Sequence, residues 1–210
     1  MRTLILARHG NTFHHGETPR RVGARTDLPL VEDERARAIG RYLRDHQWIP
    51  DRVLAAPLLR TTQTAQWAIE EMGIARTLQL APQFCEIDYG PDENQPEPAV
   101  VARIGQVAID AWNREAIVPA GWNVDVAGIL RAWREMARSV AMDERVLLVT
   151  SNGILRFAPC ILQSDTRQSD GVEFVEFAAR YGLKVATGGV CVFTDDGNGW
   201  TCLEWNVRPQ

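Results

Sequence analysis

The sequence predicts an α/β sandwich of three layers, in which a mostly parallel central sheet carries helices on both faces. Short apolar runs typical of buried strands alternate along the chain with longer amphipathic segments typical of helices. Polar residues of the kinds used in catalysis follow three of the predicted strands. The 210 residues contain no linker, internal repeat or low-complexity tract, so we expect a single domain spanning residues 1–210.

The first predicted strand, residues 3–7, is an apolar run too short for a solitary helix. It is followed directly by Arg8, His9 and Gly10. An imidazole can act as a nucleophile near neutral pH, and a guanidinium can bind a phosphate group through two hydrogen bonds. Glycine lets a ligand approach the backbone closely. The end of this strand therefore indicates a functional site.

Five further strands follow from the apolar runs at 52–55, about 77–80, 146–150, 190–194 and about 201–205. Aspartates and glycines at residues 195–199 predict a hairpin turn between the last two strands. Six helices are predicted at 34–47, after Pro57, at about 99–113, at about 125–142, from about 154, and at about 172–181. The acidic, proline-rich residues 89–98 predict a loop.

Three of these strands bring useful chemistry to one edge of the sheet. Ligands of such folds bind beyond the carboxyl ends of the strands. The second strand leads into Arg60, in the first turn of a helix that opens at Pro57, where free N–H groups favour an anion. The fourth strand runs into Ser151 and Asn152. If these strands are parallel, the three ends meet Arg8 and its neighbours at the same edge.

Composition narrows the function classes. A formal net charge of −4 argues against broad nucleic-acid binding. No apolar stretch is long enough to cross a bilayer, and the chain begins directly with a strand, so we expect neither a membrane partner nor a signal peptide. The four cysteines lack zinc-site spacing and predict reduced thiols in a cytoplasmic protein. Of the 23 basic residues, only Lys184 is lysine.

Several motifs, found in the same order along the chain, resemble those of one protein family. Residues 8–12, Arg-His-Gly-Asn-Thr, resemble the signature of the histidine phosphatase superfamily, which includes the phosphoglycerate mutases. Residues 57–65 and 86–90 resemble its second and third motifs. Residues 23–30 are similar to the segment after the signature, and residues 200–207 to the closing strand. The resemblance covers nearly the whole chain.

The resemblance implies a mechanism and no cofactor or metal. His9 would attack phosphorus in line and form a phosphohistidine, while Arg8 and Arg60 would neutralise the phosphoryl oxygens. Glu86 would protonate the leaving oxygen and then activate water, which requires a raised pKa. The substrate would be a small-molecule phosphoester.

One expected catalytic residue is absent from the chain. The family places a second histidine after the later strand, where this sequence has Ser151 or Asn152, depending on the match. Both side chains can hydrogen-bond a phosphate oxygen, but neither carries positive charge. We expect this change to cost about 1–2 kcal/mol of transition-state stabilisation, a roughly ten- to thirtyfold slower reaction.

Further candidates lie in segments expected to cover the site, about 11–27 and about 88–125. His15 takes the place of a phosphate-contacting asparagine of the family, and in its protonated form it would restore the missing charge; the alternative is a histidine exposed on a loop. Asn11 and Arg20 are candidate substrate contacts. Trp112 and Trp122 flank the segment expected to cover the site, and they would either stack on an aromatic substrate or pack in the core.

The same residues leave alternatives to hydrolysis. Because the second histidine is absent, the main alternative is a protein that binds phosphate without catalysis. Glu86 argues against this alternative, since a protein that only binds phosphate needs no proton donor. A mutase-type phosphotransferase is less favoured, because the short acidic run 91–96 would repel a carboxylated triose phosphate. Sugar phosphates, nucleotides and phosphoproteins all stay open as substrates, and the oligomeric state is open too.

Two other chemistries are rejected on spacing. A metal site would have to use residues that match no regular zinc ligand set: His9, His14, His15 and Glu17. A cysteine phosphatase would use Cys160 and Arg167, which are separated by six residues, one more than the phosphate loop of that chemistry has.

Overall fold

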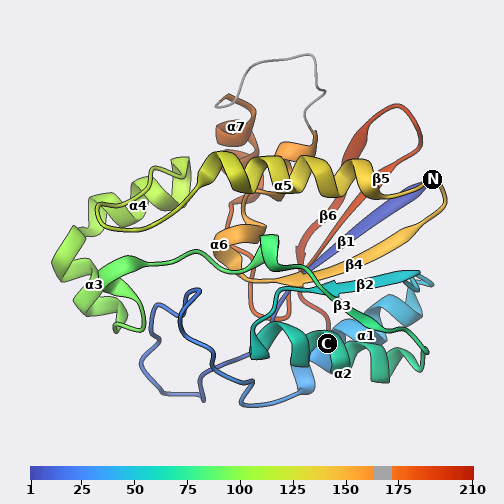
Figure 1. The fold of residues 1–210 in the computed structure, drawn as a ribbon, viewed down its shortest axis with the longest axis horizontal. Coiled ribbons are helices and arrows are strands. Elements are labelled where there is room, and N and C mark those ends of the chain that lie inside the picture. The colour runs from blue at the N-terminus through green and yellow to red at the C-terminus, as the bar shows by residue number, and fades with distance from the viewer. Residues whose placement is uncertain (163–171) are drawn as a thin grey trace.

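A single six-stranded sheet forms the centre of the protein (Figure 1). The computed structural model describes residues 1–162 and 172–210. The strands are β1 (Arg2–Arg8), β2 (Arg52–Ala55), β3 (Leu78–Leu80), β4 (Arg145–Thr150), β5 (Val190–Asp195) and β6 (Trp200–Val207). All six predicted strands are confirmed, and their ends differ from the predicted ones by two residues at most.

The sheet is parallel where the site is expected. Its strand order is β3-β2-β4-β1-β5-β6, in which the first four strands are parallel and the last two antiparallel. Arg8 of β1 lies opposite Thr150 of β4, and Ala55 of β2 lies opposite Val149. The carboxyl ends of β1, β2 and β4 therefore share one edge, as predicted.

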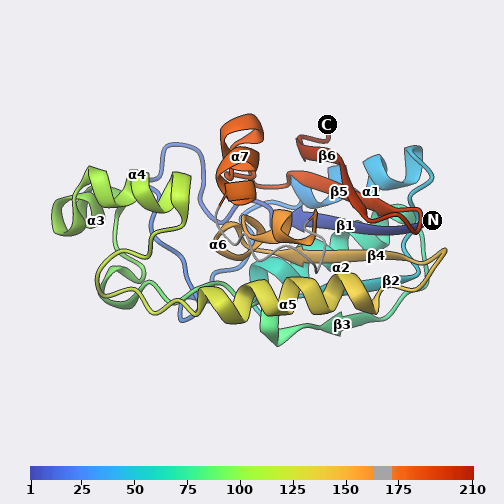
Figure 2. The ribbon, with the colours of Figure 1, turned by 90° about the horizontal axis from the view of Figure 1, so that it is seen from above.

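Helices cover both faces of the sheet (Figures 1 and 2). They are α1 (Glu34–Asp45), α2 (Leu59–Met72), α3 (Glu97–Ile104), α4 (Gln106–Glu115), α5 (Val126–Ser139), α6 (Asn152–Leu155) and α7 (Val172–Tyr181). On one face Ile39 of α1 and Ala68 of α2 pack against Ile5 of β1. On the other face Trp133 of α5 packs against Leu4. The predicted three-layer α/β sandwich is confirmed.

Two predicted helices and one predicted loop are wrong in detail. The helix expected at about 99–113 is two helices, because Gly105 between α3 and α4 adopts a φ of 82° that a helix cannot contain. The helix expected from about 154 is the short α6, followed by a 3₁₀ turn at Ala158–Leu162. The loop expected at 89–98 contains a 3₁₀ turn at Gly90–Asp92 and the start of α3.

The two predicted covering segments contact each other. The Arg21 N–H donates to the carbonyl of Gln95 at 2.9 Å, and the Asn94 N–H donates to the carbonyl of Arg21 at 2.7 Å. Loop 11–27 thus runs beneath α3 in the view of Figure 1 and is bonded to the segment that precedes this helix. Trp112 and Trp122 are buried edge to face with ring centroids 5.5 Å apart, so they pack in the core.

No helix within the described residues has both the length and the apolar character needed to cross a membrane.

Candidate active site

His9 lies immediately after β1 and is buried. Its Nδ1 is 2.8 Å from the carbonyl oxygen of Gly10. A carbonyl only accepts hydrogen bonds, so Nδ1 carries the proton and Nε2 of the neutral ring holds a free lone pair. Burial, together with the positive charges of Arg8 and Arg60, lowers the pKa of His9 well below its ordinary value of 6.5. The imidazole is therefore neutral and available as a nucleophile at neutral pH.

Arg60 is fully buried in the first turn of α2. Its Nη1 donates to the carbonyl of Thr26 at 2.8 Å, and its Nη2 donates to the carbonyl of Gly23 at 3.2 Å. Its Nε–H donates to Ser151 Oγ at 3.4 Å. No carboxylate forms an ion pair with Arg60 in the part of the chain that the structure describes. A full positive charge is thus held by neutral groups next to His9, an arrangement suited to an anion.

Arg8 is held by the segment that precedes β5. Its Nη1 donates to the carbonyl of Val185 at 2.6 Å, while its buried Nε has no hydrogen-bond partner among the described residues. The Val185 N–H in turn donates to Oδ1 of Asn152 at 2.8 Å. Asn152 therefore fixes the segment that orients Arg8, whereas its neighbour Ser151 lies against Arg60.

Glu86 follows the 3₁₀ turn at Pro82–Phe84 and is buried. Its Oε1 accepts from the N–H of Ile87 at 3.0 Å, and its Oε2 accepts from the N–H of Gly153 at 3.2 Å. Burial raises the pKa of Glu86 above its ordinary value of 4.5, although Arg60 and the two N–H donors act in the opposite direction. A carboxyl group of this kind can hold a proton closer to neutral pH and give it up to a leaving group.

The absence of a side chain at Gly153 leaves room for the carboxyl group of Glu86, and we expect Gly153→Ala to displace that carboxyl group. A Cβ at residue 153 would lie 2.1 Å from Oε1 of Glu86 and 3.2 Å from Cγ1 of Ile87. Moving the carboxyl group by about 1 Å should lower kcat by roughly 10²-fold, since catalytic groups tolerate little misplacement. Steady-state kinetics of the variant check this expectation.

A double-mutant cycle separates displacement of Glu86 from general damage to the fold. If Gly153→Ala acts through Glu86, it should lower kcat little further in a Glu86→Gln background. An equal loss of kcat in both backgrounds would contradict the assignment, as would a large fall in thermal midpoint.

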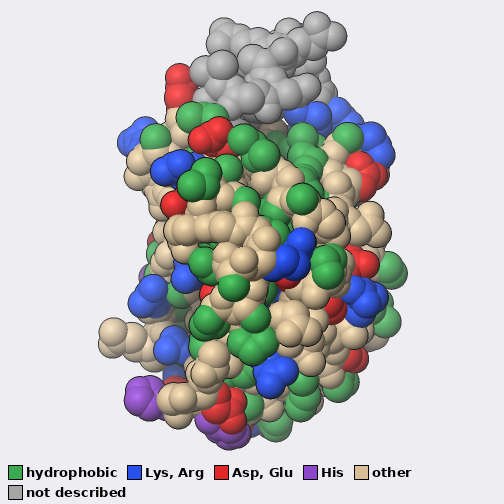
Figure 3. Space-filling model, turned by 90° about the vertical axis from the view of Figure 1, so that its left-hand side faces the viewer, with side chains coloured by type: hydrophobic (Ala, Val, Ile, Leu, Met, Phe, Trp, Pro, Cys, Tyr) green, Lys and Arg blue, Asp and Glu red, His purple; other side chains and the backbone are tan. Residues whose placement is uncertain are grey.

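The other predicted site residues are exposed or bonded to neighbouring segments of the chain. His15 is exposed and forms no hydrogen bond with the described residues, which favours the exposed-loop alternative; histidines lie at the surface of this end of the molecule (Figure 3). Arg20 is also exposed, and its Nη1 donates to the carbonyl of Asn94 at 3.2 Å. Asn11 accepts through Oδ1 from Thr187 Oγ1 at 2.6 Å. These two residues join segments of the chain together.

The carboxylates of the expected acidic cover have partners within the protein. Asp92 is 1% exposed, pairs with Arg103 and accepts from Trp122 Nε1 at 2.7 Å. Glu93 accepts from the backbone N–H groups of Gly23 and Arg25, at 3.0 and 3.1 Å. Arg103 offsets the charge of Asp92, whereas the donors to Glu93 are neutral, so the repulsion of a carboxylated substrate stays a prediction.

The rejected chemistries gain no support from the geometry. In residues 1–162 and 172–210, no three histidine, cysteine, aspartate or glutamate side chains converge as a metal site would require. Burial raises the pKa of the Cys160 thiol to about 12, which keeps it protonated and poorly nucleophilic. Arg167, its partner in the cysteine-phosphatase alternative, lies outside the described residues.

Sequence reasoning missed the groups that hold the two arginines. The carbonyls of Gly23 and Thr26 orient Arg60, and the carbonyl of Val185 orients Arg8. Backbone carbonyls leave no mark in the residue types, so no sequence signal could have found them.

Comparisons with known proteins agree with this fold. A 2,3-bisphosphoglycerate-dependent phosphoglycerate mutase of Methylobacterium sp. (strain 4-46) is 29% identical over 174 residues, which are 80% of this chain and 84% of that protein. The mycobacterial glucosyl-3-phosphoglycerate phosphatase in complex with VO3 has a TM-score of 0.77 at 21% identity, covering 99% of this chain and 100% of that one. For the alpha-ribazole phosphatase from Shigella flexneri the TM-score is 0.71 at 19% identity, covering 99% and 97%.

At these identities the solved structures establish the fold. The sequence itself matches the family described as histidine phosphatase superfamily (branch 1) over residues 4–208. That match includes the strand end at His9 as well as Arg60 and Glu86. The chain therefore belongs to the histidine phosphatase superfamily.

Proposed function

We propose that this protein hydrolyses a small-molecule phosphomonoester through a phosphohistidine intermediate at His9. The observation that carries the proposal is the state of His9, a buried neutral imidazole whose Nδ1 is bonded to Gly10 and whose Nε2 is free. Electrostatic interactions link His9 to Arg8 and Arg60, and link both arginines to Glu86. These four groups supply a nucleophile, charge for the phosphoryl oxygens and a proton donor.

In the first step, Nε2 of His9 attacks phosphorus in line with the leaving oxygen. The P–N bond forms as the P–O bond to the alcohol breaks, and protonated Glu86 gives its proton to the departing oxygen. Arg8 and Arg60 compensate the negative charge of the equatorial oxygens throughout. Gly10 keeps its hydrogen bond to Nδ1, which stabilises the positive charge that the ring acquires.

In the second step, water hydrolyses the phosphohistidine. Glu86, now a carboxylate, takes a proton from water as the oxygen attacks phosphorus. The P–N bond breaks, inorganic phosphate leaves, and both His9 and Glu86 return to their starting protonation states. The net reaction consumes one ester and one water.

We assign Ser151 to the position of the absent second histidine. The hydrogen bond from Arg60 to Ser151 supports this, as does the commitment of Asn152 to Val185. Ser151→Ala is expected to lower kcat about fivefold, because losing one hydrogen bond removes roughly 1 kcal/mol of transition-state stabilisation. Ser151→His should raise kcat about ten- to thirtyfold by returning a charged donor.

Phosphate-release kinetics of both Ser151 variants test the assignment, with thermal midpoints measured to confirm folding. A folded Ser151→Ala variant with unchanged kcat, alongside a folded Ser151→His variant that is no faster, would remove Ser151 from the site. Asn152→Ala should act differently, by loosening Arg8 and raising KM for the ester.

We favour hydrolysis over phosphoryl transfer. Two of the structural neighbours are named as phosphatases, while the sequence relative is named as a mutase. The test is to incubate a panel of phosphomonoesters in ¹⁸O-labelled water and follow the phosphoryl group. We expect inorganic phosphate carrying one labelled oxygen. Isomerised esters without phosphate release would indicate a mutase, and tight phosphate binding without turnover would indicate a non-catalytic binder.

A further inference from the structure

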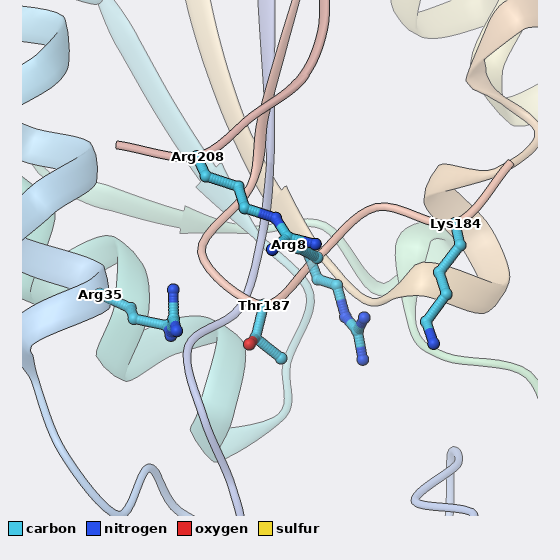
Figure 4. Close-up of a pocket in the computed structure, with 6 residues that line it drawn as sticks. Arg8, Arg35, Lys184, Thr187 and Arg208 are labelled. Atoms are coloured by element: carbon cyan, nitrogen blue, oxygen red, sulfur yellow. The ribbon is translucent and has the colours of Figure 1, made fainter. Parts of the chain in front are cut away.

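A cavity lies beside the carboxyl end of β1, on the side of β5 (Figure 4). Its volume is about 410 Å³, within the range of small-molecule sites. The lining consists of four cations and two small residues: Arg8, Arg35, Lys184, Arg208, Ala186 and Thr187. In Figure 4, Arg35 and Lys184 lie on opposite sides, with Arg8 and Thr187 between them. The chain's only lysine is thus one of four cations around a single cavity.

These four cations lack carboxylate partners. Within residues 1–162 and 172–210, none of them forms an ion pair. Arginines elsewhere on this acidic chain do pair, as Arg2 does with Asp195 and Arg103 with Asp92. Like charges gathered around one cavity repel each other unless an anion lies between them. The cavity therefore has the electrostatics of an anion site.

Arg8 contributes an unsatisfied donor to this lining. Its Nε is buried and has no hydrogen-bond partner among the described residues. A buried donor of a charged group without a partner is costly, and such groups commonly await a ligand or water. Arg8 also precedes His9 in the chain, so the cavity adjoins the proposed reaction centre.

The cavity wall is fastened to the end of β1. The N–H of Gly188 lies 3.1 Å from the carbonyl of Arg8 and 3.0 Å from that of His9. Gly188 has a φ of 72°, and a Cβ there would lie 2.9 Å from Cβ of Arg35, so glycine lets α1 approach this wall closely. Thr187 is bonded to Asn11 across the same boundary. The cavity and the strand end therefore hold a fixed relation to each other.

We propose that this cavity binds a second anionic group of the substrate, a phosphate, sulfate or carboxylate carried on the same molecule as the ester that His9 attacks. This inference rests on the proposed phosphatase activity and narrows it to esters with two anionic groups. Lys184, Arg35 and Arg208 bind the second group, while Arg8 lies between the two anions and links them.

The experiment compares matched esters that differ only in the second group. The α,ω-alkanediol bisphosphates with two to six carbons are assayed beside the corresponding monophosphates. We expect the bisphosphate of the best length to have a kcat/KM at least about tenfold higher than its monophosphate, which corresponds to one charge-assisted contact. The preference should weaken as salt is added.

Lys184→Met, Arg35→Met and Arg208→Met remove charge while keeping most of the apolar stem. Each variant should lower the preference for bisphosphate over monophosphate about three- to tenfold and leave monophosphate turnover unchanged. Arg145→Met is the matched control, because this exposed arginine begins β4 at the opposite edge of the sheet. It removes the same charge and should leave the preference intact.

Three results would overturn the inference while leaving the proposed function standing. One is a wild type that turns over monophosphates without preferring any bisphosphate. Another is a set of variants that lose activity equally on both esters. The third is sulfate that binds the cavity as a separate ligand and changes monophosphate turnover in a manner that depends on Lys184.

A binding measurement keeps the inference testable if no ester is turned over. Calorimetry with the His9→Ala variant should show tighter binding of the bisphosphate than of the monophosphate, and Lys184→Met should remove the difference. Equal affinities there would reject the second subsite, whereas absence of turnover alone rejects only the proposed activity.

Discussion

His9→Ala is expected to abolish hydrolysis, lowering kcat by at least about 10⁴-fold, as removal of a covalent nucleophile does in other enzymes. No other histidine is placed to replace it, because His14 and His15 are exposed on loop 11–27 and His46 follows α1. The loss should be seen with every ester, since each one reacts by forming a P–N bond to His9. Rates of phosphate release for wild type and variant, measured on one panel of esters, give the comparison.

Trapping the intermediate makes this prediction specific to His9. Wild type quenched during turnover of a ³²P-labelled ester should carry label that is stable to alkali and lost in acid, as expected of a phosphohistidine. His9→Ala should carry none, while the surface control His14→Ala should be labelled normally. His9→Ala should still bind inorganic phosphate, because Arg8 and Arg60 remain in place. Labelled His9→Ala protein would show that the nucleophile is another residue.

The part of the site that sequence could predict is the part fixed by strand ends. Buried strands are recognisable from short apolar runs, and parallel strands bring their carboxyl ends to one edge. That rule alone placed Arg8, Arg60 and Ser151 together, and the structure has Arg60 in contact with Ser151. Glu86 is buried, and burial raises its pKa in the direction that its expected role requires.

The contacts that could not be predicted from the sequence are polar and join residues that are far apart along the chain. Arg8 bonds to Val185, 177 residues away, and Asn152 acts through that same residue. Glu93 looked like a free carboxylate in an acidic run, yet it is a hydrogen-bond acceptor for loop 11–27. Nothing in the pattern around these residues specifies a partner, because a polar side chain fits many surroundings until the fold brings one to it. The cavity beside β1 could not be predicted from the sequence for the same reason, since Arg35, Lys184 and Arg208 belong to three separate segments.

Glu86→Gln is expected to separate the two chemical steps. For an alkyl phosphate, whose alkoxide needs a proton, kcat/KM should fall about 10²- to 10⁴-fold, the usual contribution of a general acid. For p-nitrophenyl phosphate, whose phenolate leaves without a proton, kcat/KM should fall less than about tenfold. Hydrolysis of the intermediate still needs a base for both esters, so the variant should release a burst of p-nitrophenol and accumulate phosphohistidine. Equal losses for the two esters, with no burst, would assign Glu86 a purely structural role.

The pH dependence of the same variant follows from the raised pKa of Glu86. The first step needs Glu86 protonated and His9 neutral, so wild-type kcat/KM for an alkyl phosphate should fall as pH rises through the folded-state pKa of Glu86. Glu86→Gln should lose that limb and keep the one from ionisation of the ester, whose second pKa is about 6.

The stability of the protein should depend on pH through the same group. Since folding raises the pKa of Glu86, the folded state binds more protons than the unfolded state, and wild-type stability falls as pH rises from 4.5 through the folded-state pKa. The glutamine variant has no such group, although it gives up one of the two hydrogen bonds from Ile87 and Gly153. The thermal midpoint of the variant should therefore rise relative to that of wild type as pH rises over this window, while the activity of the variant on alkyl phosphates stays low. A midpoint difference that does not change with pH would mean that the pKa of Glu86 is not raised in the folded state, and the case for it as the proton donor would fail.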